Sequence, residues 1–344
     1  MKGLSLRKWL ITILLLVILL IVTIIFCSFQ GSADIKLKDL LEIFSNSPGQ
    51  TWWNTKAVIL FKVRLPRIIL ACMVGGALAV SGVVLQALLR NPLADPYILG
   101  VSSGSALGAI IAILLGLNIT IGSLPSIPLF GFAGGLLTIL FVYQISKIHS
   151  KISVQTMLLV GVVTGAILAA IIMFITSIAG PHKVQGIIFW LMGSLTSQGY
   201  PMVAIVSFYV IVGILILFYH ARSLNLLVLG EESATQLGLD VERTKKIAFI
   251  GASLITGAAV SVSGLIGFVG ILIPHVMRMI IGSDHRLLLP AAGLCGSIYL
   301  IIADTLARTL MAPAEIPVGV ITAICGGPFF IYLLKTKKRA IFFH

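Results

Sequence analysis

Only a few ionisable side chains lie inside the apolar parts of this sequence, where they could carry proton chemistry. Asp304 is followed four residues later by Arg308, and His275 lies in a different apolar run. Ionisable groups at such positions are costly, and a series of them can relay protons. Residues four apart share one face of a helix, however, so Asp304 and Arg308 are expected to neutralise each other. We therefore favour a local ion pair over a proton relay, and hydrogen bonding inside a helix bundle for His275.

Motifs for other kinds of catalysis are missing from the sequence. It contains no GxxxxGK[ST] loop to hold nucleotide phosphates, no HExxH zinc motif and no GxSxG nucleophile motif. The four cysteines form no CxxC pair and have no histidine at metal-ligand spacing, so they are expected to pack as small apolar side chains. The sequence predicts a protein that is not an enzyme, with no catalytic residue, no metal site and no cofactor of its own.

The composition indicates that lipid surrounds most of the chain. Of the 344 residues, 58% are hydrophobic and 10% are charged, and the mean hydropathy is +1.12. A globular protein has about 25% charged residues, so this chain has too few charges to solvate a surface of its size. The net charge is +13, but the basic residues lie between apolar runs, where they set membrane topology. Nucleic-acid binding is therefore not expected.

The elements that must position these groups are membrane helices. Apolar runs occur at residues 9–33, 68–89, 97–117, 125–145, 154–179, 200–219, 247–277, 287–306 and 316–334. The run 247–277 is too long for one crossing of about 20 residues and too short for two full crossings. We predict two passes with one shortened, a turn at Ser261–Gly264, and close packing at Gly267 and Gly270. The fold class is thus an all-α polytopic membrane protein with about ten transmembrane helices, one of them shortened, in a single domain over residues 1–344.

Basic residues at the ends of the runs predict the orientation. In the ten-helix arrangement, 16 of the 24 Lys and Arg residues lie on the side of the N-terminus and of the basic C-terminal tail. Because short basic flanks remain in the cytoplasm, both termini are expected there.

Two segments between the runs are long enough to have a role of their own. At residues 35–44 apolar and charged residues alternate, which favours a short interfacial helix, and Trp52 and Trp53 suit an aromatic belt. In the cytoplasmic loop 220–246, residues 231–239 predict a short helix, which we call the knob. Glu231 and Glu232 lie in its first turn, where the helix dipole favours negative charge, and Gly238 can close it in the left-handed conformation. Such a segment is either a solvated loop or a rigid element that docks into a soluble partner.

A series of motifs runs in order from about residue 60 to residue 335. They are Arg64-Leu65-Pro66-Arg67, Gly75-Gly76-Ala77-Leu78-Ala79-Val80-Ser81-Gly82, Asn91-Pro92-Leu93-Ala94-Asp95-Pro96, Gly230-Glu231-Glu232, Gly267-Phe268-Val269-Gly270 and Glu315-Ile316-Pro317-Val318-Gly319. Together they resemble the FecCD-type permeases, the membrane subunits of bacterial ABC importers for iron–siderophore chelates, haem and cobalamin. The resemblance implies the type II ABC importer permease fold, which has ten crossings.

The resemblance also implies roles for particular residues. Coupling to an ATPase would fall to Glu231, Glu232, Gln236, Leu237 and Gly238 in the loop 220–246. Docking of a substrate-binding protein would use Arg64, Arg67 and Arg308. A cytoplasmic gate would be formed by Asn91, Leu93, Ser153, Val154 and Gln155.

The partners and cargo that follow from the resemblance are those of an importer. The chain would pair with a second copy of itself, with two ATP-binding subunits that use ATP and Mg, and with an extracytoplasmic substrate-binding protein. It would lie in the bacterial plasma (inner) membrane and carry a ferric siderophore, haem or cobalamin. The alternative is a proton-coupled secondary transporter that uses Asp304 and His275; an intramembrane enzyme is disfavoured because no pair of acids or nucleophile–base set is present.

Overall fold

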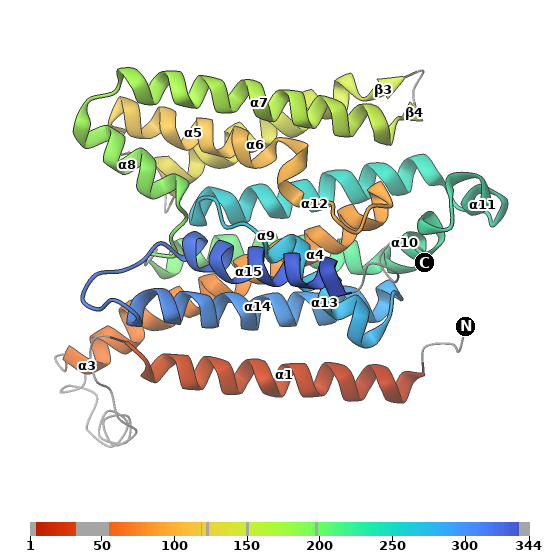
Figure 1. Cartoon of the computed structure of the whole chain (residues 1–344), viewed down its shortest axis with the longest axis horizontal. Helices are drawn as coiled ribbons and strands as arrows, with labels where there is room; N and C mark the ends of the chain where they lie inside the picture. The colour runs from red at the N-terminus through yellow and green to blue at the C-terminus, as the bar shows by residue number, and fades with distance from the viewer. Residues whose placement is uncertain are drawn as a thin grey trace.

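The computed structural model of the chain describes residues 5–31, 55–117, 119–121, 124–148, 151–196 and 199–336. The interfacial helix predicted at 35–44, the tryptophans at 52 and 53, and most of the basic C-terminal tail lie outside these residues. The described part is a bundle of helices that run roughly along one direction (Figure 1).

Most of the described residues form helices. In chain order these are α1 (Leu6–Phe29), α3 (Thr55–Val58), the π-helix η2 (Ile59–Arg64), α4 (Leu65–Leu89), the 3-10 helix η3 (Pro96–Leu99), α5 (Val101–Leu115), α6 (Ser126–Ile145), α7 (Val154–Ile178), α8 (Pro181–Leu191), α9 (Tyr200–Tyr219), α10 (Ala221–Val228), α11 (Glu231–Gln236), α12 (Val241–Ser263), α13 (Val269–Ile281), α14 (His285–Thr309) and α15 (Val318–Thr336). Two short antiparallel pairs join neighbouring helices: β1 (Thr120–Ile121) with β2 (Leu124–Pro125), and β3 (Lys147–Ile148) with β4 (Lys151–Ile152).

Ten of the described helices correspond to the predicted crossings. Seven are long and apolar enough to span a membrane, namely α1, α4 with its N-terminal extension, α6, α7, α9, α12 and α14. Three shorter apolar helices, α5, α13 and α15, complete the set. The predicted all-α membrane architecture is confirmed, because long apolar segments have to satisfy their backbone hydrogen bonds within the helix.

The long run 247–277 does form two passes. α12 ends at Ser263, the left-handed Gly264 (φ +65°) reverses the chain, and α13 is the shortened helix of 13 residues. Gly270 is packed closely, since a Cβ atom there would lie 2.6 Å from Cδ of Pro96. The prediction of close packing was wrong for Gly267, where an added Cβ atom would have no neighbour within 4 Å.

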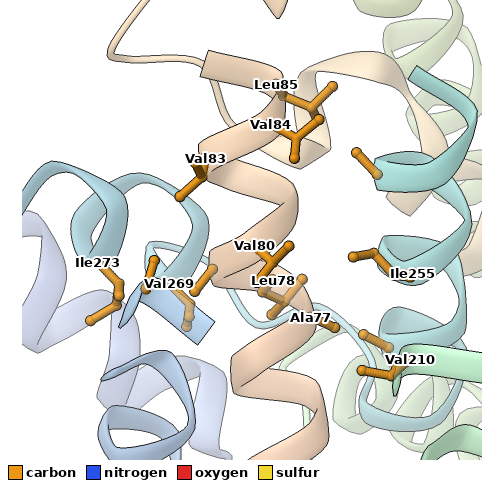
Figure 2. Packing of buried hydrophobic residues seen from close by; sticks show 14 of the residues in the cluster. Ala77, Leu78, Val80, Val83, Val84, Leu85, Val210, Ile255, Val269 and Ile273 are labelled. Carbon is orange, nitrogen blue, oxygen red and sulfur yellow. The ribbon is translucent and has the colours of Figure 1, made fainter. Parts of the chain in front are cut away.

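Helix α4 forms the centre of the bundle. Its residues Ala77, Leu78, Val80, Val83, Val84 and Leu85 lie among residues of α9, α12 and α13 (Figure 2), and α14 packs along another side. At Gly82 an added Cβ atom would collide with the carbonyl oxygen of Gly270, and at Gly75 with that of Gly296. Glycine at these positions lets the backbones of α4, α13 and α14 approach closely, which is how helices associate in lipid.

The helices outside the membrane spans mark the two ends of the bundle. One end, which we call the knob end, carries α10, α11 and the β3–β4 pair (Figure 1). The first turn of α1 is tied there, because Nζ of Lys8 and Nε1 of Trp9 donate to the carbonyl oxygens of Ile281 and Arg286, at 3.2 and 3.0 Å. The opposite end carries α3 and α8; no helix was predicted between residues 180 and 199, where α8 lies.

Candidate functional site

The knob is a helix with a defined end at both sides. Gly230 (φ +120°) precedes α11 and Gly238 (φ +82°) follows it. The amide of Gly238 donates to the carbonyl of Thr235 (2.9 Å), and the amide of Leu239 donates to that of Ala234 (3.0 Å). This pair of bonds is the Schellman motif, so Gly238 closes the helix in the left-handed conformation as predicted.

Most of the knob faces away from the bundle. Ala234 is buried against the rest of the chain, whereas Glu232, Gln236 and Gly238 are exposed and Leu237 is 60% exposed. Removing a large apolar side chain from water is favourable, so an exposed leucine on a rigid element can stabilise contact with a partner.

Glu231 differs from its neighbours because its carboxylate turns towards the bundle. Its Oε2 atom lies 3.0 Å from Nζ of Lys245 in α12, and its Oε1 atom lies 4.0 Å from Nη2 of Arg90 at the end of α4. Glu231 therefore attaches the knob to the membrane helices.

A second connection holds the segment before the knob. Asn225 of α10 donates from Nδ2 to Oδ1 of Asp284 (2.9 Å) and accepts from the amide of His285 (2.9 Å). Leu224 and Leu227 on the same helix are buried. The region 220–246 is thus largely helical and fixed to the bundle.

The first predicted gate segment is a tight turn directly after α4. Arg90 adopts the left-handed conformation (φ +46°), and Oδ1 of Asn91 accepts a bond from the amide of Leu93 (2.9 Å). Asn91 is exposed and Leu93 is half-buried. The hydroxyl of Tyr97, a few residues later, donates to the carbonyl of Ile266 (2.7 Å) and accepts from its amide (2.9 Å). The segment is therefore fixed to the α12–α13 turn.

The second predicted gate segment is the start of α7. Oγ of Ser153 accepts from the amide of Thr156 (3.3 Å), so Ser153 caps the helix. Val154 is half-buried and Gln155 is exposed. The two gate segments are linked through η3, which packs on α7, since a Cβ atom at Gly161 would meet the backbone of Leu99.

The three arginines that were predicted to meet a binding protein lie at the opposite end of the bundle. Nε of Arg67 lies 3.0 Å from both carboxylate oxygens of Asp304, and its Nη1 lies 2.8 Å from Oε2 of Glu315. Nε of Arg308 lies 3.2 Å from Oδ2 of Asp304. Nη1 of Arg64 donates to the carbonyl oxygens at the end of α1.

These arginines are bonded within the chain. Arg64, Arg67 and Arg308 are only 3, 5 and 8% exposed, whereas the side chain of Glu315 is 48% exposed. The Asp304–Arg308 pair was predicted from their spacing and is present. The docking role remains a prediction. Since Glu315 already occupies Nη1 of Arg67, an acidic group of a partner would have to displace Glu315 to bind that atom.

The two residues considered for a proton relay are far apart. His275 lies six residues before the end of α13, and Asp304 lies 19 residues into α14, which starts at the same end of the bundle. At 1.5 Å per residue their levels differ by about 20 Å. His275 contacts the ring of Phe330, with centroids 6.1 Å apart. The geometry therefore provides no direct path between them.

Lys245 was not singled out from the sequence, yet it lies at the centre of the knob end. It is only 2% exposed, and its Nζ atom lies within 3.0 Å of Glu231, Glu242 and the carbonyl oxygen of Ile152. In the sequence Lys245 reads as one of several basic residues before an apolar run, and nothing local distinguishes it from Lys246.

Comparison with known proteins gives consistent matches over most of the chain. The model of the FecCD transport family matches residues 18–336. The chain is 44% identical over 285 residues to the cobalamin import system permease protein BtuC of Halobacterium salinarum, covering 83% of this chain and 75% of that one. It is 38% identical over 326 residues to the hemin transport system permease protein HmuU of Yersinia pestis, covering 94 and 95%. A solved structure of a metal-chelate type ABC transporter in an inward-facing conformation superposes with a TM-score of 0.83 at 31% identity, covering 94% of this chain and 98% of that one.

Proposed function

The chain belongs to the FecCD transport family, and from this we propose that it is the membrane-spanning subunit of an ATP-driven importer. Its fold is that of ABC importer permeases of the type II class, as the superposition over nearly the whole chain demonstrates. In this proposal the chain is a translocation subunit without catalytic residues, and separate subunits hydrolyse ATP.

The observation that carries the proposal is the knob. A short helix closed by glycines at both sides, attached through Glu231 and carrying an exposed Leu237, has the form of a rigid docking element. In a proton-driven carrier this element would have no partner. We propose that the knob inserts into the ATPase subunit and transmits its movement.

The remaining partners follow from the same proposal. Two copies of the chain would enclose the pathway, each with one ATP-binding subunit at the knob end, which would face the cytoplasm. ATP and Mg would be bound by those subunits. An extracytoplasmic substrate-binding protein would dock at the opposite end, where a carboxylate on its surface would replace Glu315 beside Arg67 in a charge-assisted bond.

The cargo is proposed as a class. Relatives are permeases for cobalamin and hemin, and the structural neighbour is a metal-chelate type transporter. We propose a large metal chelate, either a ferric siderophore, haem or cobalamin, selected mainly by the binding protein.

A proton-coupled carrier is not favoured by the geometry. The carboxylate of Asp304 is paired with both Arg67 and Arg308, and it is 1% exposed. Both oxygens of this carboxylate are occupied by guanidinium groups, and His275 lies about 20 Å away along the bundle, so the two residues do not form a relay.

The test is a single substitution at the tip of the knob. Leu237→Asp is expected to lower both ATPase binding and ATP-dependent uptake by at least about tenfold, because burying a leucine contributes roughly 1.5–3 kcal/mol. Leu229→Asp is the matched control, since Leu229 is equally exposed (60%) but precedes the knob. Binding is measured by co-purification of the ATPase subunit, and uptake in proteoliposomes.

Two results would contradict the proposal. One is a Leu237→Asp variant that binds the ATPase and transports as well as the unaltered chain. The other is uptake that continues with an ATPase unable to hydrolyse ATP and that follows a proton gradient, which would identify a carrier.

A further inference from the structure

Lys245 is a buried lysine whose ammonium group has its three hydrogen-bond donors occupied. Nζ lies 2.6 Å from Oε1 of Glu242, 2.7 Å from the carbonyl oxygen of Ile152 and 3.0 Å from Oε2 of Glu231. Lysines are almost never fully buried unless they are paired, because removing the charge from water is costly. An apolar residue would fill this position at lower cost, so the ammonium group is expected to serve a purpose other than stability.

The three acceptors belong to different segments of the chain. Glu231 begins the knob, Glu242 lies one turn before Lys245 in α12, and Ile152 is the last residue of β4. Oε2 of Glu242 also accepts a bond from the amide of Ile152 (2.7 Å). Both backbone groups of Ile152 are therefore held by charged side chains of α12.

These contacts connect the knob to both predicted gate segments. Ile152 is followed directly by Ser153, the first residue of one segment. Arg90, whose Nη2 atom lies 4.0 Å from Glu231, is followed directly by Asn91, the first residue of the other. Glu231, the first residue of the knob, thus contacts Arg90 directly before one gate segment. Through Lys245 it is connected to Ile152, directly before the other.

We propose that Lys245 is a positioning residue that transmits the displacement of the knob to the gate. The inference rests on the proposed function, in which an ATPase moves the knob. When Glu231 moves with the knob, the ammonium group has to follow it or give up the bond, and following it pulls on the carbonyl of Ile152. The ammonium group is buried and all its donors are occupied, so it has few alternative partners inside the bundle, and the movement is expected to be transmitted rather than absorbed.

The test measures movement of the gate segment with spin labels. Cysteines replace Lys151, which is exposed beside Ile152, and Gln185, which is exposed on α8 at the opposite end. The four native cysteines are replaced by alanine, and labelled chain is diluted with unlabelled chain so that each assembly carries one labelled copy. The full chain with its ATPase partner is examined without nucleotide and after trapping with Mg-ATP and vanadate.

Lys245→Met removes the donors while keeping an unbranched side chain. We expect it to retain ATPase binding and to lower, by about fivefold or more, the equilibrium ratio of molecules with the nucleotide-bound label distance to molecules with the original one, because couplings between sites typically change equilibria by about 5–150-fold. Lys245→Arg, which can donate to the same acceptors, is expected to restore most of the shift. The matched control is Lys246→Met, which removes an exposed charge one residue further and should behave like the unaltered chain.

A second variant covers the case in which Lys245→Met does not fold. Glu231→Gln breaks the ion pair at the knob but leaves Lys245 paired with Glu242, and the side chain of Glu231 is 44% exposed, so the fold should tolerate it. It is expected to lose the gate shift as well.

The outcomes separate this inference from the proposed function. A full gate shift in Lys245→Met, or in Glu231→Gln, would overturn the role of Lys245 and leave the importer proposal standing. Loss of ATPase binding in both variants would make Lys245 a structural support of the knob and would also overturn its role. Absence of any shift in the unaltered chain with bound ATPase would overturn both proposals.

Discussion

Replacing Arg67 with methionine removes the main partner of Asp304 without changing the length of the side chain greatly. In the structure Arg67 contacts Asp304 at 2.9–3.0 Å through Nε and Nη2, and both side chains are buried. Methionine fills much of the same space with an apolar group. The substitution therefore tests the energy of the buried ion pair more than that of packing.

The size of the effect follows from what remains around Asp304. Removing one partner of a buried ion pair costs about 3–5 kcal/mol, because the other charge is left without compensation. Here Arg308 stays 3.2 Å from the same carboxylate, so the lower end of that range is expected. A loss of about 3 kcal/mol lowers the ratio of folded to unfolded chain by roughly a hundredfold.

The assay is reversible unfolding of the purified chain in mixed micelles, followed by circular dichroism. Asp304→Asn and the double variant Arg67→Met/Asp304→Asn complete a double-mutant cycle. The double variant should be clearly less destabilised than the sum of the two single variants. Arg222→Met removes an exposed arginine of α10 and is the control. A loss below about 1 kcal/mol for Arg67→Met, or additive effects in the cycle, would refute the reasoning.

Two further perturbations address packing and pH. Gly82→Ala should destabilise the bundle by about 1–3 kcal/mol in the same unfolding assay, because its Cβ atom would displace the backbone of Gly270. Gly267→Ala is the control and should be neutral, because the space around it is open. Equal stability of the two variants would contradict the close contact at Gly82. A hydrogen bond from Arg286 lowers the pKa of Asp284 from 3.8 to about 2, so the stabilisation from this carboxylate is complete above pH about 4 and is lost as the pH falls through about 2. In the unaltered chain the free energy of unfolding should fall as the pH is lowered from about 4 to about 2, and in Asp284→Asn this fall should be smaller. The same pH profile in both chains would contradict the stabilising role of the Asp284 carboxylate.

Much of the fold follows from local features of the sequence. The ten helices and the left-handed end of the knob at Gly238 were predicted. The turn after α12 was predicted at Ser261–Gly264; it begins at Gly264, because Ser261–Ser263 are still helical. Each depends on hydrophobic length, on a glycine able to adopt a positive φ, or on charges at a helix end, which act within a few residues. The Asp304–Arg308 pair was predicted for the same reason.

Other features were outside the reach of local reasoning. The arginines at 64 and 67 read as exposed basic residues, because nothing near them in the sequence provides an acidic partner; the partner of Arg67 is 237 residues away. Lys245 read as a flanking charge, since its contact with Ile152 joins residues 93 apart.

The sequence by itself determined that lipid surrounds this protein, how many helices cross the membrane, which family it resembles and where the knob lies. Hydrophobicity and helix ends, on which these features depend, are properties of short segments. Only the tertiary structure decided which charges meet, which are buried and how the knob connects to the gate segments. Those properties depend on the pairing of helices through backbone approach at residues such as Gly75 and Gly82, and helix pairing in lipid is set by complementary shape, which no single segment contains.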